Sequence, residues 1–472
     1  MLVFTIALLL VSLVAFLVIG SLQANTIKTR EDMYSASSGL DRFQVARTVL
    51  AANVSIAGGM QWFLVQGSDV GLQIILWGPI AVLIGMYLNA IFVERYAPEN
   101  VFTGYSSFTT MVRDLFEGRA ATAVLLIITS LGSLTILLIE IYVGVQVLKV
   151  FFPQIDVAGI GVLGFVVAAV TLYAVMGGLL GIVRNDWIQN AIIASVGIVV
   201  VIVIIGGSTS PYHEVRPAPA HEYTPMGIDL ITWLVIVNLF FIPTQLRFWQ
   251  VAGSAVSRSD FVRGYKRAAV QTALFWSLLA VAGYALLHYT GNSFETLDGL
   301  LSDLKNGPQH IAISVMFAII SLAAFAALVS SADSAIISLA QAASDVLVPA
   351  SNNVLLQRAI VAAVGLLSFV IYVAVFLVLG TQFFAVFSSA FSLFILIAPM
   401  VGIALVDRAT AKSKLYQYVS LGGLVVSLIV VLLSTYTALP YLPNSLWAGA
   451  IGFAICLVAA VSAALIARRH RG

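Results

Sequence analysis

The chain has 472 residues, of which 61% are hydrophobic and 9% charged, and its mean hydropathy is +1.04. This composition excludes a soluble globular protein and indicates that most of the chain faces lipid or other lipid-facing helices. The net charge of +2 gives no information about acidic partners, and the single cysteine, Cys456, excludes a disulfide framework and a cysteine-based metal site.

Thirteen apolar stretches are long enough to cross a bilayer as helices. In chain order they are 2–22, 45–66, 71–93, 119–150, 158–178, 187–206, 228–248, 268–290, 308–345, 357–380, 382–405, 415–436 and 445–467. The first stretch lacks the basic region of a signal peptide and continues into a charged loop, so we predict a true span. The sequence therefore predicts an all-α integral membrane protein with about 13 transmembrane helices.

The basic residues alternate between the predicted loops, and short cytoplasmic loops retain Lys and Arg during insertion. Nineteen of the 23 basic residues fall on one side, whereas Lys149, Arg216 and Lys305 fall on the other and Arg247 lies near a helix end. We therefore predict a multi-pass protein of the cell membrane (plasma or inner membrane), with the N-terminus outside and the C-terminus in the cytoplasm.

The stretches between the predicted spans are too short to form a separate domain. The largest, 207–227 and 291–307, are expected to hold short interfacial helices or lids. The sequence has no Gly-rich phosphate loop, Cys/His cluster or basic-aromatic patch, so it supports neither an ATP-driven pump nor a nucleic-acid partner. No nucleophile and base pair occurs at one depth, so we expect no enzyme activity, and transport would use an ion gradient.

The stretch 308–345 contains a carboxylate and a cluster of hydroxyls at the depth of the bilayer. A buried Asp333 costs at least a few kcal/mol, which favours a cation or proton as its partner. Ala327, Ser330 and Ser331 stand at i, i+3 and i+4, so a carbonyl and two hydroxyls share one helix face. Hard monovalent cations prefer such oxygens. Serines also serve as packing residues in membrane helices, and that alternative stays open.

The stretch 45–66 carries Gly58 and Gly59 in mid-span, and each glycine weakens a helix by about 1 kcal/mol relative to alanine. A helix broken there frees carbonyls to coordinate an ion where the backbone lines a cavity. Close packing of helices against the glycines is the alternative.

Three further charged residues lie in or near predicted spans. Asp186 stands at the predicted start of the stretch 187–206, where it is interpreted as a helix cap. Glu140 lies about mid-span and is a candidate to line a cavity, bind a proton or pair with a neighbour. Arg247 either captures a carboxylate through bidentate hydrogen bonds or extends to the membrane interface.

Four segments in order resemble the sodium/solute symporter family, which includes sodium-coupled sugar, proline, sialic acid and iodide carriers. Residues 173–179 followed by 185–189 resemble its Gly-Gly…Thr-Asp-x-x-Gln signature, and 51–55 is similar to the start of its first core helix. Residues 327–338 with Ser344 and Asp345 resemble its eighth core helix, and 250–264 resembles the run after its sixth. The resemblance covers roughly residues 40 to 410.

The resemblance implies a leucine-transporter-like fold built from two inverted repeats of five helices, with alternating access around a site at the bilayer midplane. The core would comprise residues 45–405, as the second to sixth and the seventh to eleventh predicted helices. Residues 1–44 would form a peripheral helix and a cytoplasmic loop, and residues 406–472 the C-terminal peripheral helices.

The resemblance also implies ion ligands. A first sodium site would use the carbonyls of Ala51, Val54 and Ala327 and the hydroxyls of Ser330 and Ser331. A second sodium site, found in some members, would use Asp186, Ser330, Asp333 and Ser334. Sodium would be a co-transported ion rather than a prosthetic group.

The substrate would bind beside the broken part of the second predicted helix. Candidate lining residues are Gly58, Gln61, Trp62, Gln66, Trp77, Asn238, Gln245, Gln382, Phe383 and Phe384. Ala57, Gly58, Ile74 and Trp77 stand where the sugar carriers place acid and amide groups. Unpaired sugar hydroxyls would cost roughly 1–3 kcal/mol each. A small amino acid or carboxylate is therefore favoured over a sugar.

The sequence thus predicts a sodium-coupled symporter that imports a small organic solute and functions as a monomer in the lipid bilayer. One alternative is coupling to protons, with Asp333 or Asp186 titrating. A second alternative is a membrane module that senses a solute without coupled transport. We expect no attached signalling domain, because only a few residues follow the last predicted span.

Overall fold

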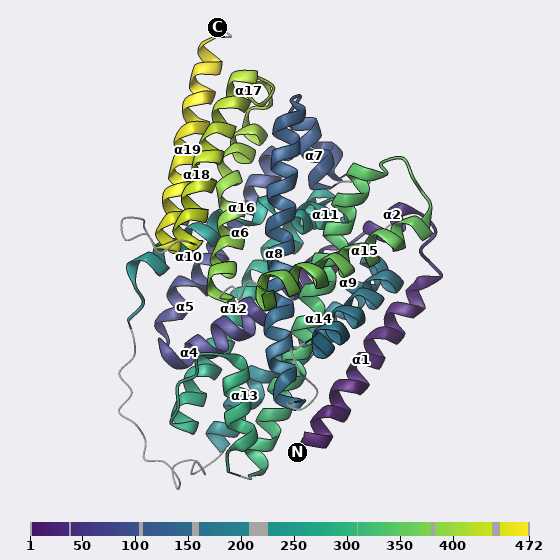
Figure 1. Cartoon of the computed structure of the whole chain (residues 1–472), viewed down its shortest axis with the longest axis vertical. Coiled ribbons are helices and arrows are strands. Elements are labelled where there is room, and N and C mark those ends of the chain that lie inside the picture. Colours follow the sequence, from purple (N-terminus) through teal and green to yellow (C-terminus); the bar gives the residue numbers. More distant parts are fainter. Residues whose placement is uncertain are drawn as a thin grey trace.

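The computed structural model describes residues 2–36, 39–102, 107–152, 160–206, 225–308, 310–378, 383–436 and 444–470. In these ranges the regular structure is helical (Figure 1), apart from an isolated bridge between Leu40 and Ala255. Ten of the described helices are long and apolar enough to cross a membrane. The chain is therefore a multi-pass membrane protein.

The first half of the chain contains α1 (Leu2–Ala24), α2 (Arg30–Tyr34), α3 (Arg42–Asn53), the π-helical segment η1 (Ile56–Val65), α4 (Gln66–Asp69), α5 (Gln73–Trp77), α6 (Pro79–Tyr96), η2 (Glu99–Phe102), α7 (Phe108–Leu115), α8 (Arg119–Phe151) and α9 (Ile160–Gly206). The second half contains α10 (Ile228–Phe240), η3 (Ile242–Thr244), α11 (Leu246–Ser254), α12 (Arg258–Thr290), α13 (Leu297–Asn306), α14 (Ile311–Leu347), α15 (Val354–Tyr372), η4 (Val373–Val378), α16 (Phe383–Val406), α17 (Arg408–Ala411), α18 (Lys414–Tyr436) and α19 (Ser445–Arg469).

The first broken helix consists of α3, η1 and α4, with a bend of 65° between Asn53 and Ile56. The chain leaves the helix at Val54, and Ser55 begins the next one because its hydroxyl accepts a hydrogen bond from the backbone N–H of Gly58 at 2.7 Å. The break therefore precedes the glycine pair that weakens this helix, and the glycines lie inside η1.

The second broken helix consists of α10, η3 and α11. Pro243 lies in η3, where its missing N–H removes one donor, and Gln245 then adopts an extended conformation before α11 begins. One broken helix therefore lies in each half of the chain, as expected for a fold of two repeats.

The predicted stretches 158–178 and 187–206 form one element, α9, of 47 residues. A straight helix of that length would be about 70 Å long, more than twice the hydrocarbon core of a bilayer. Gly178 interrupts it with φ 51°, a left-handed conformation that favours glycine. Because α9 continues through Asp186, the interpretation of Asp186 as a helix cap is wrong.

Eleven described spans result if the first broken helix counts as one, and α10 is a shorter apolar helix of 13 residues. The total of thirteen spans stays a prediction. Of the two predicted exterior stretches, 291–307 contains α13, as expected for a short helix, whereas most of 207–227 lies outside the described residues.

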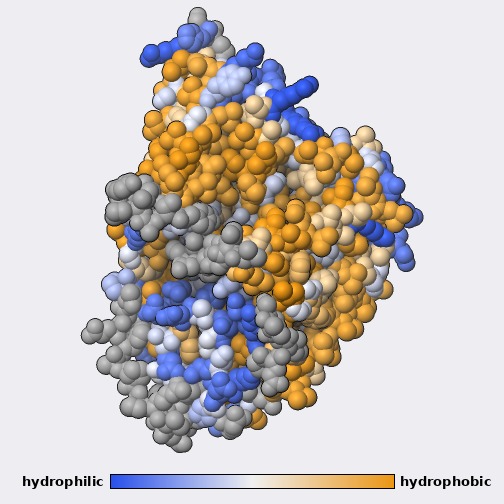
Figure 2. Space-filling view, viewed as in Figure 1, coloured by the Kyte–Doolittle hydropathy of each residue, from blue (hydrophilic) through white to orange (hydrophobic). Residues whose placement is uncertain are grey.

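Helix α14 occupies the centre of the bundle, where α1, α3, α8, α9, α11 and α15 contact it. Its middle is rich in alanine and serine, which allow neighbouring backbones to approach closely. In contrast, α1 packs on α9 and α14 along one edge, and α18 and α19 pack on α16 along another (Figure 1). A broad apolar band covers much of the face seen in Figure 2, as contact with lipid requires.

Candidate functional site

The end of α3 meets the middle of α14 through buried oxygens. The Ser330 hydroxyl donates to the Ala51 carbonyl at 3.2 Å, and the Ser331 hydroxyl contacts the Ala327 carbonyl, one turn earlier, at 2.7 Å. Val54 caps α3 three residues beyond Ala51 and is fully buried. The structure thus brings the five residues of the expected first sodium site to the break in the first broken helix.

Glu140 of α8 lies at the same break. Its Oε2 accepts hydrogen bonds from the backbone N–H groups of Ile56 at 3.0 Å and Ala57 at 3.3 Å, and from the Ser331 hydroxyl at 2.7 Å. The first N–H groups of a helix have no partner within it, and the helix dipole favours a negative charge there. Glu140 therefore serves as the side-chain partner of the broken backbone.

Ser331 connects Glu140 to the neutral oxygens of α14. A hydroxyl carries one proton, so Ser331 donates either to Glu140 or to the Ala327 carbonyl at any instant. When Ser331 donates to Glu140, its oxygen lone pairs are free for a cation. Donation to a carboxylate also makes the hydroxyl oxygen a better ligand for that cation.

A second polar cluster, which we term the acid cluster, comprises Asp186 of α9, Asp333 and Ser334 of α14, Arg247 of α11 and Thr48 of α3. The Thr48 hydroxyl donates to Asp186 Oδ2 at 2.6 Å, and its carbonyl accepts from Arg247 Nη2 at 3.0 Å. The Ser334 hydroxyl contacts Asp333 Oδ1 at 2.9 Å. The acid cluster therefore contains two carboxylates and a guanidinium.

Arg247 interacts with both carboxylates of the acid cluster. Its Nη2 is 4.0 Å from Asp186 Oδ2, an ion pair without a direct hydrogen bond, and it interacts electrostatically with Asp333 as well. Asp186 and Asp333 are fully buried, and the Arg247 side chain is 11% exposed. The Ser334 hydroxyl donates to the Ser330 carbonyl at 2.8 Å, so Ser330 connects the break to the acid cluster.

Among the described residues, the acid cluster and Gln189 contain several buried polar atoms that have no hydrogen-bond partner in the protein. They are Asp186 Oδ1, Asp333 Oδ2, Arg247 Nε and Nη1, and both amide atoms of Gln189. Buried polar groups are normally hydrogen-bonded, so such a group of atoms is suited to a polar ligand, water or an ion.

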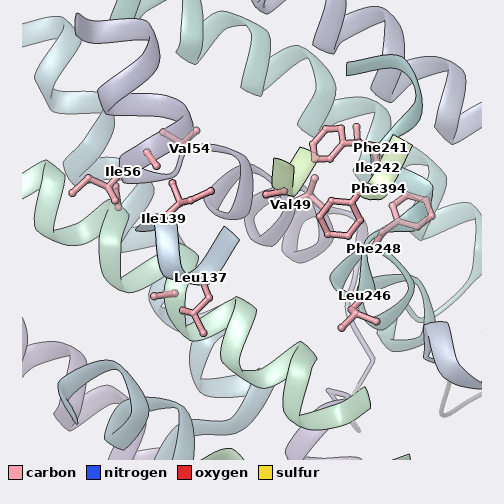
Figure 3. Packing of buried hydrophobic residues seen from close by; sticks show 14 of the residues in the cluster. Val49, Val54, Ile56, Leu137, Ile139, Phe241, Ile242, Leu246, Phe248 and Phe394 are labelled. Carbon is pink, nitrogen blue, oxygen red and sulfur yellow. The ribbon is translucent and has the colours of Figure 1, made fainter. Parts of the chain in front are cut away.

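A cavity of about 130 Å³ lies beside the break, between the two broken helices. Its polar lining includes Glu140 and Arg247, which bring charges of opposite sign to one cavity. Its walls are mostly apolar and include Phe241, Trp276, Phe387, Phe391 and Phe394. Figure 3 shows the packing nearby, with Val54 and Ile56 on one side and Phe241, Ile242 and Phe394 together on the other.

Two of the expected substrate-binding residues, Gly58 and Gln245, line this cavity. Trp62 does not line it but stacks on Phe387, with ring centroids 5.6 Å apart. Gln61 instead donates to the Glu295 carbonyl at 3.1 Å and accepts from the Leu297 N–H at 2.7 Å, so it holds η1 against the start of α13.

The other expected substrate-binding residues lie elsewhere. Asn238 donates to the Leu234 carbonyl of its own helix at 2.8 Å. Gln66 is half-buried and Trp77 is 36% exposed, and neither lines the cavity. Gln382 lies outside the described residues. Phe383 and Phe384 begin α16, but their side chains lie outside the described part of the chain.

Sequence reasoning expected aromatic walls but did not identify the aromatic residues that line this cavity. Trp276 of α12 donates its indole N–H to the Asn53 carbonyl at 3.0 Å, which satisfies one backbone group at the end of α3. Nothing in the pattern of a long apolar helix distinguishes Trp276 from a lipid-facing tryptophan. Glu140, in contrast, could be identified from the sequence, because it is a carboxylate in the middle of a predicted span.

A third polar group closes the end of the bundle beyond the acid cluster. Asp345, near the end of α14, pairs with Arg30 of α2 and accepts a hydrogen bond from the Ser107 hydroxyl, which caps α7. Arg113 donates to the Asp345 carbonyl at 3.2 Å. These contacts tie α2 and α7 to the central helix, about 16 Å along α14 from Ser334.

No protein-family model matches the chain, and no curated protein matches its sequence. Solved structures match it over nearly its whole length. A sodium-coupled sialic acid symporter, in a substrate-bound outward-open state, is 18% identical with a TM-score of 0.68 and covers 98% of this chain and 97% of its own. The chain has the leucine-transporter-like fold. This confirms the fold expected from the sequence.

Two further structures show how widely the leucine-transporter-like fold is used. MhsT in complex with L-phenylalanine is 15% identical with a TM-score of 0.56, covering 91% of this chain and 98% of its own. A manganese transporter of Eremococcus coleocola is 14% identical with the same TM-score, covering 93% of this chain and 99% of its own. The fold therefore does not determine the solute or the ion, and these must be argued from the site.

Proposed function

We propose that the chain is a sodium-coupled secondary active symporter that imports a small organic solute by alternating access. The observation that carries this proposal is the meeting of Ala51, Ser330 and Ser331 at a broken helix, directly beside a cavity. A cation bound there would join α3 and η1 to α14 and would touch the wall of the substrate cavity. One ion would thereby stabilise both the solute site and one arrangement of the helices.

The chemistry of the break supports sodium as the coupling ion. Three carbonyls and two hydroxyls offer neutral hard oxygens, and Glu140 supplies a negative charge through Ser331 without being a necessary direct ligand. A proton needs no such set of five oxygens. The buried carboxylates nevertheless keep proton coupling as the alternative that the experiment below must separate from sodium.

The cavity supports a small zwitterion, such as an amino acid, as the solute. Its volume of about 130 Å³ is well below the roughly 300–1,000 Å³ of pockets for drug-sized ligands. An ammonium group would be attracted to Glu140 and a carboxylate to Arg247, whose Nε and Nη1 make no hydrogen bond in the described structure. A simple carboxylate would satisfy only Arg247, and a sugar would leave several hydroxyls among aromatic side chains.

The direction and the unit of transport follow from the same proposal. We infer import because the positive loops favour an N-terminus outside and a C-terminus in the cytoplasm, and because sodium gradients across cell membranes point inward. The break and the cavity are both made by residues of one chain, so a monomer suffices for transport.

The test is uptake into proteoliposomes that contain the purified protein. A panel of labelled amino acids, carboxylates and sugars would be offered under a sodium gradient, a proton gradient or neither. We expect an amino acid to accumulate with the sodium gradient alone. Accumulation that follows pH and ignores sodium would favour the proton-coupled alternative, and binding without accumulation would favour a solute sensor.

A further inference from the structure

The acid cluster already contains a cation. Arg247 Nη2 lies 4.0 Å from Asp186 Oδ2, and Thr48 holds the two together, because its hydroxyl donates to Asp186 and its carbonyl accepts from Arg247. Asp333 interacts electrostatically with the same guanidinium. Three elements that meet only in the folded chain, α9, α11 and α14, each contribute one formal charge.

The charge balance of the acid cluster decides how strongly it attracts another ion. With both aspartates ionised, Asp186, Asp333 and Arg247 sum to a net charge of −1, whereas the carboxylates alone would give −2. A sodium ion entering this space would also approach the guanidinium, a like charge, in surroundings where such repulsion is poorly screened. A side-chain cation, Arg247, therefore already lies beside the residues that the sequence analysis assigned to a second sodium ion.

We propose that Arg247 is the resident counter-ion of Asp186 and Asp333, so that the chain binds one sodium ion at the break of the first broken helix and none at the acid cluster. This inference rests on the proposed sodium-coupled function and specifies its ion stoichiometry. A flexible side chain replaces a diffusible ion in one of two neighbouring oxygen clusters.

The position of Arg247 gives this counter-ion a second role. It lies in the first turn of α11, directly after the break in the second broken helix, and it also lines the substrate cavity. The Asp186 and Asp333 carboxylates lie on α9 and α14 instead. A movement of α11 against those helices would therefore change the distance between guanidinium and carboxylates, and a solute carboxylate would compete with them for Arg247.

The test measures bound radioactive sodium per molecule of purified full-length protein, with choline as the replacement cation. We expect about one sodium ion in the wild type and in Arg247→Lys, which keeps a resident cation. We expect about two in Arg247→Gln, because the exposed carboxylates and the hydroxyls of Ser330 and Ser334 then offer a second oxygen site. The measurement needs no knowledge of the solute.

A charge-balanced variant protects the test against misfolding. The double variant Arg247→Gln with Asp333→Ser keeps the wild-type net charge of the acid cluster but lacks the guanidinium, so we expect about two ions there as well. One sodium ion in both variants, or two in the wild type, would overturn the inference. The increase in bound sodium ions from wild type to variant tests whether Arg247 is the resident cation. The number bound by the wild type tests the proposed sodium coupling, and a value of zero would contradict that coupling.

Discussion

The break in the first broken helix and the acid cluster lie one turn apart on α14, but the break presents mainly neutral oxygens whereas the acid cluster contains buried charges of both signs. At the break, the neutral oxygens of Ala51 and Ser330 lie within hydrogen-bond distance of each other, and the negative charge, Glu140, accepts a hydrogen bond from the neighbouring Ser331 hydroxyl. In the acid cluster, two fully buried carboxylates share the surroundings of one guanidinium, whose Nη2 lies 4.0 Å from Asp186 Oδ2.

Under the proposed function, the difference indicates which region would use a diffusible ion. Backbone and hydroxyl oxygens repel one another only weakly, and backbone N–H groups hold the Glu140 carboxylate, so the break would be able to release and rebind an ion. Two buried carboxylates without a cation would be strongly unfavourable, so the acid cluster needs a partner that never leaves. A site that must release its ion in every cycle is better made from the first kind of ligand.

The largest expected effect comes from Glu140. Glu140→Ala leaves the N–H groups of Ile56 and Ala57 without an acceptor at about 1–3 kcal/mol per buried group, so we expect the free energy of unfolding to fall by about 2–5 kcal/mol. Glu140→Gln keeps an acceptor and loses the charge, so we expect nearly normal stability and sodium affinity weakened about tenfold. Thermal unfolding and sodium titration measure the two effects. Unchanged sodium affinity in Glu140→Gln would remove Glu140 from the ion site.

Ser331→Ala should act on ion binding with little effect on folding. Alanine is the best helix former, and the change removes one expected ligand together with the link to Glu140. We expect sodium affinity to fall about tenfold or more, which corresponds to about 1.4 kcal/mol or more. The matched control is Ser338→Ala: Ser338 lines the cavity, and among the described residues its hydroxyl donates to the Ala335 carbonyl of its own helix alone. Equal losses in both variants would contradict the assignment.

Thr48→Val should show the reverse pattern. The substitution keeps the shape of the side chain and the carbonyl that holds Arg247, but it removes the hydrogen bond to Asp186. We expect stability to fall by about 1.5–3 kcal/mol, since the lost bond is to a charged group, while sodium affinity changes less than about threefold. A loss of sodium affinity as large as that of Ser331→Ala would mean that the acid cluster binds sodium.

The smallest effect is expected from an ion pair that lies outside both regions. Asp407, between α16 and α17, is slightly desolvated, which raises its pKa, but hydrogen bonds from Thr410 and Arg468 outweigh this and lower the pKa to about 2. Its stabilising contribution is therefore present above the ordinary value near 4 and is lost as the pH falls toward 2.

Because this pair is largely solvated, we expect Asp407→Asn to cost less than about 1 kcal/mol at neutral pH. Melting temperatures of the wild type and the variant, measured from pH 7 downward, should converge as the pH falls from about 4 to about 2. A difference that persists at the lowest pH would show that the asparagine perturbs the cap of α17 rather than the charge.

Much of the fold was predictable from local sequence. A predicted span such as 119–150 agrees with α8 (Arg119–Phe151), because a bilayer demands a minimum apolar length and charges end it. The position of the first break was less predictable. The glycines at 58 and 59 indicated a break, but the helix ends earlier, at Val54, because the Ser55 hydroxyl caps η1 and so starts a new helix there.

The candidate site was predictable only in part. Ser330, Ser331 and Asp333 follow from spacing and charge on one helix, and resemblance added Ala51 and Asp186. The contacts that Gln61 and Asn238 make could not be predicted in the same way. Both are amides in apolar stretches, and only the structure shows that Gln61 bonds to the segment before α13 and that Asn238 bonds to its own helix.

The sequence by itself determined the solvent, most of the apolar stretches that form helices, and the helix that carries the oxygens, because these depend on hydropathy and on spacing along one element. Tertiary structure decided what the buried charges face. Glu140 and Arg247 lie 107 positions apart in the chain, yet both line the cavity, and each meets its partners only where α8, α9, α11 and α14 converge. Electrostatic interactions depend on distance in space, which no local pattern contains.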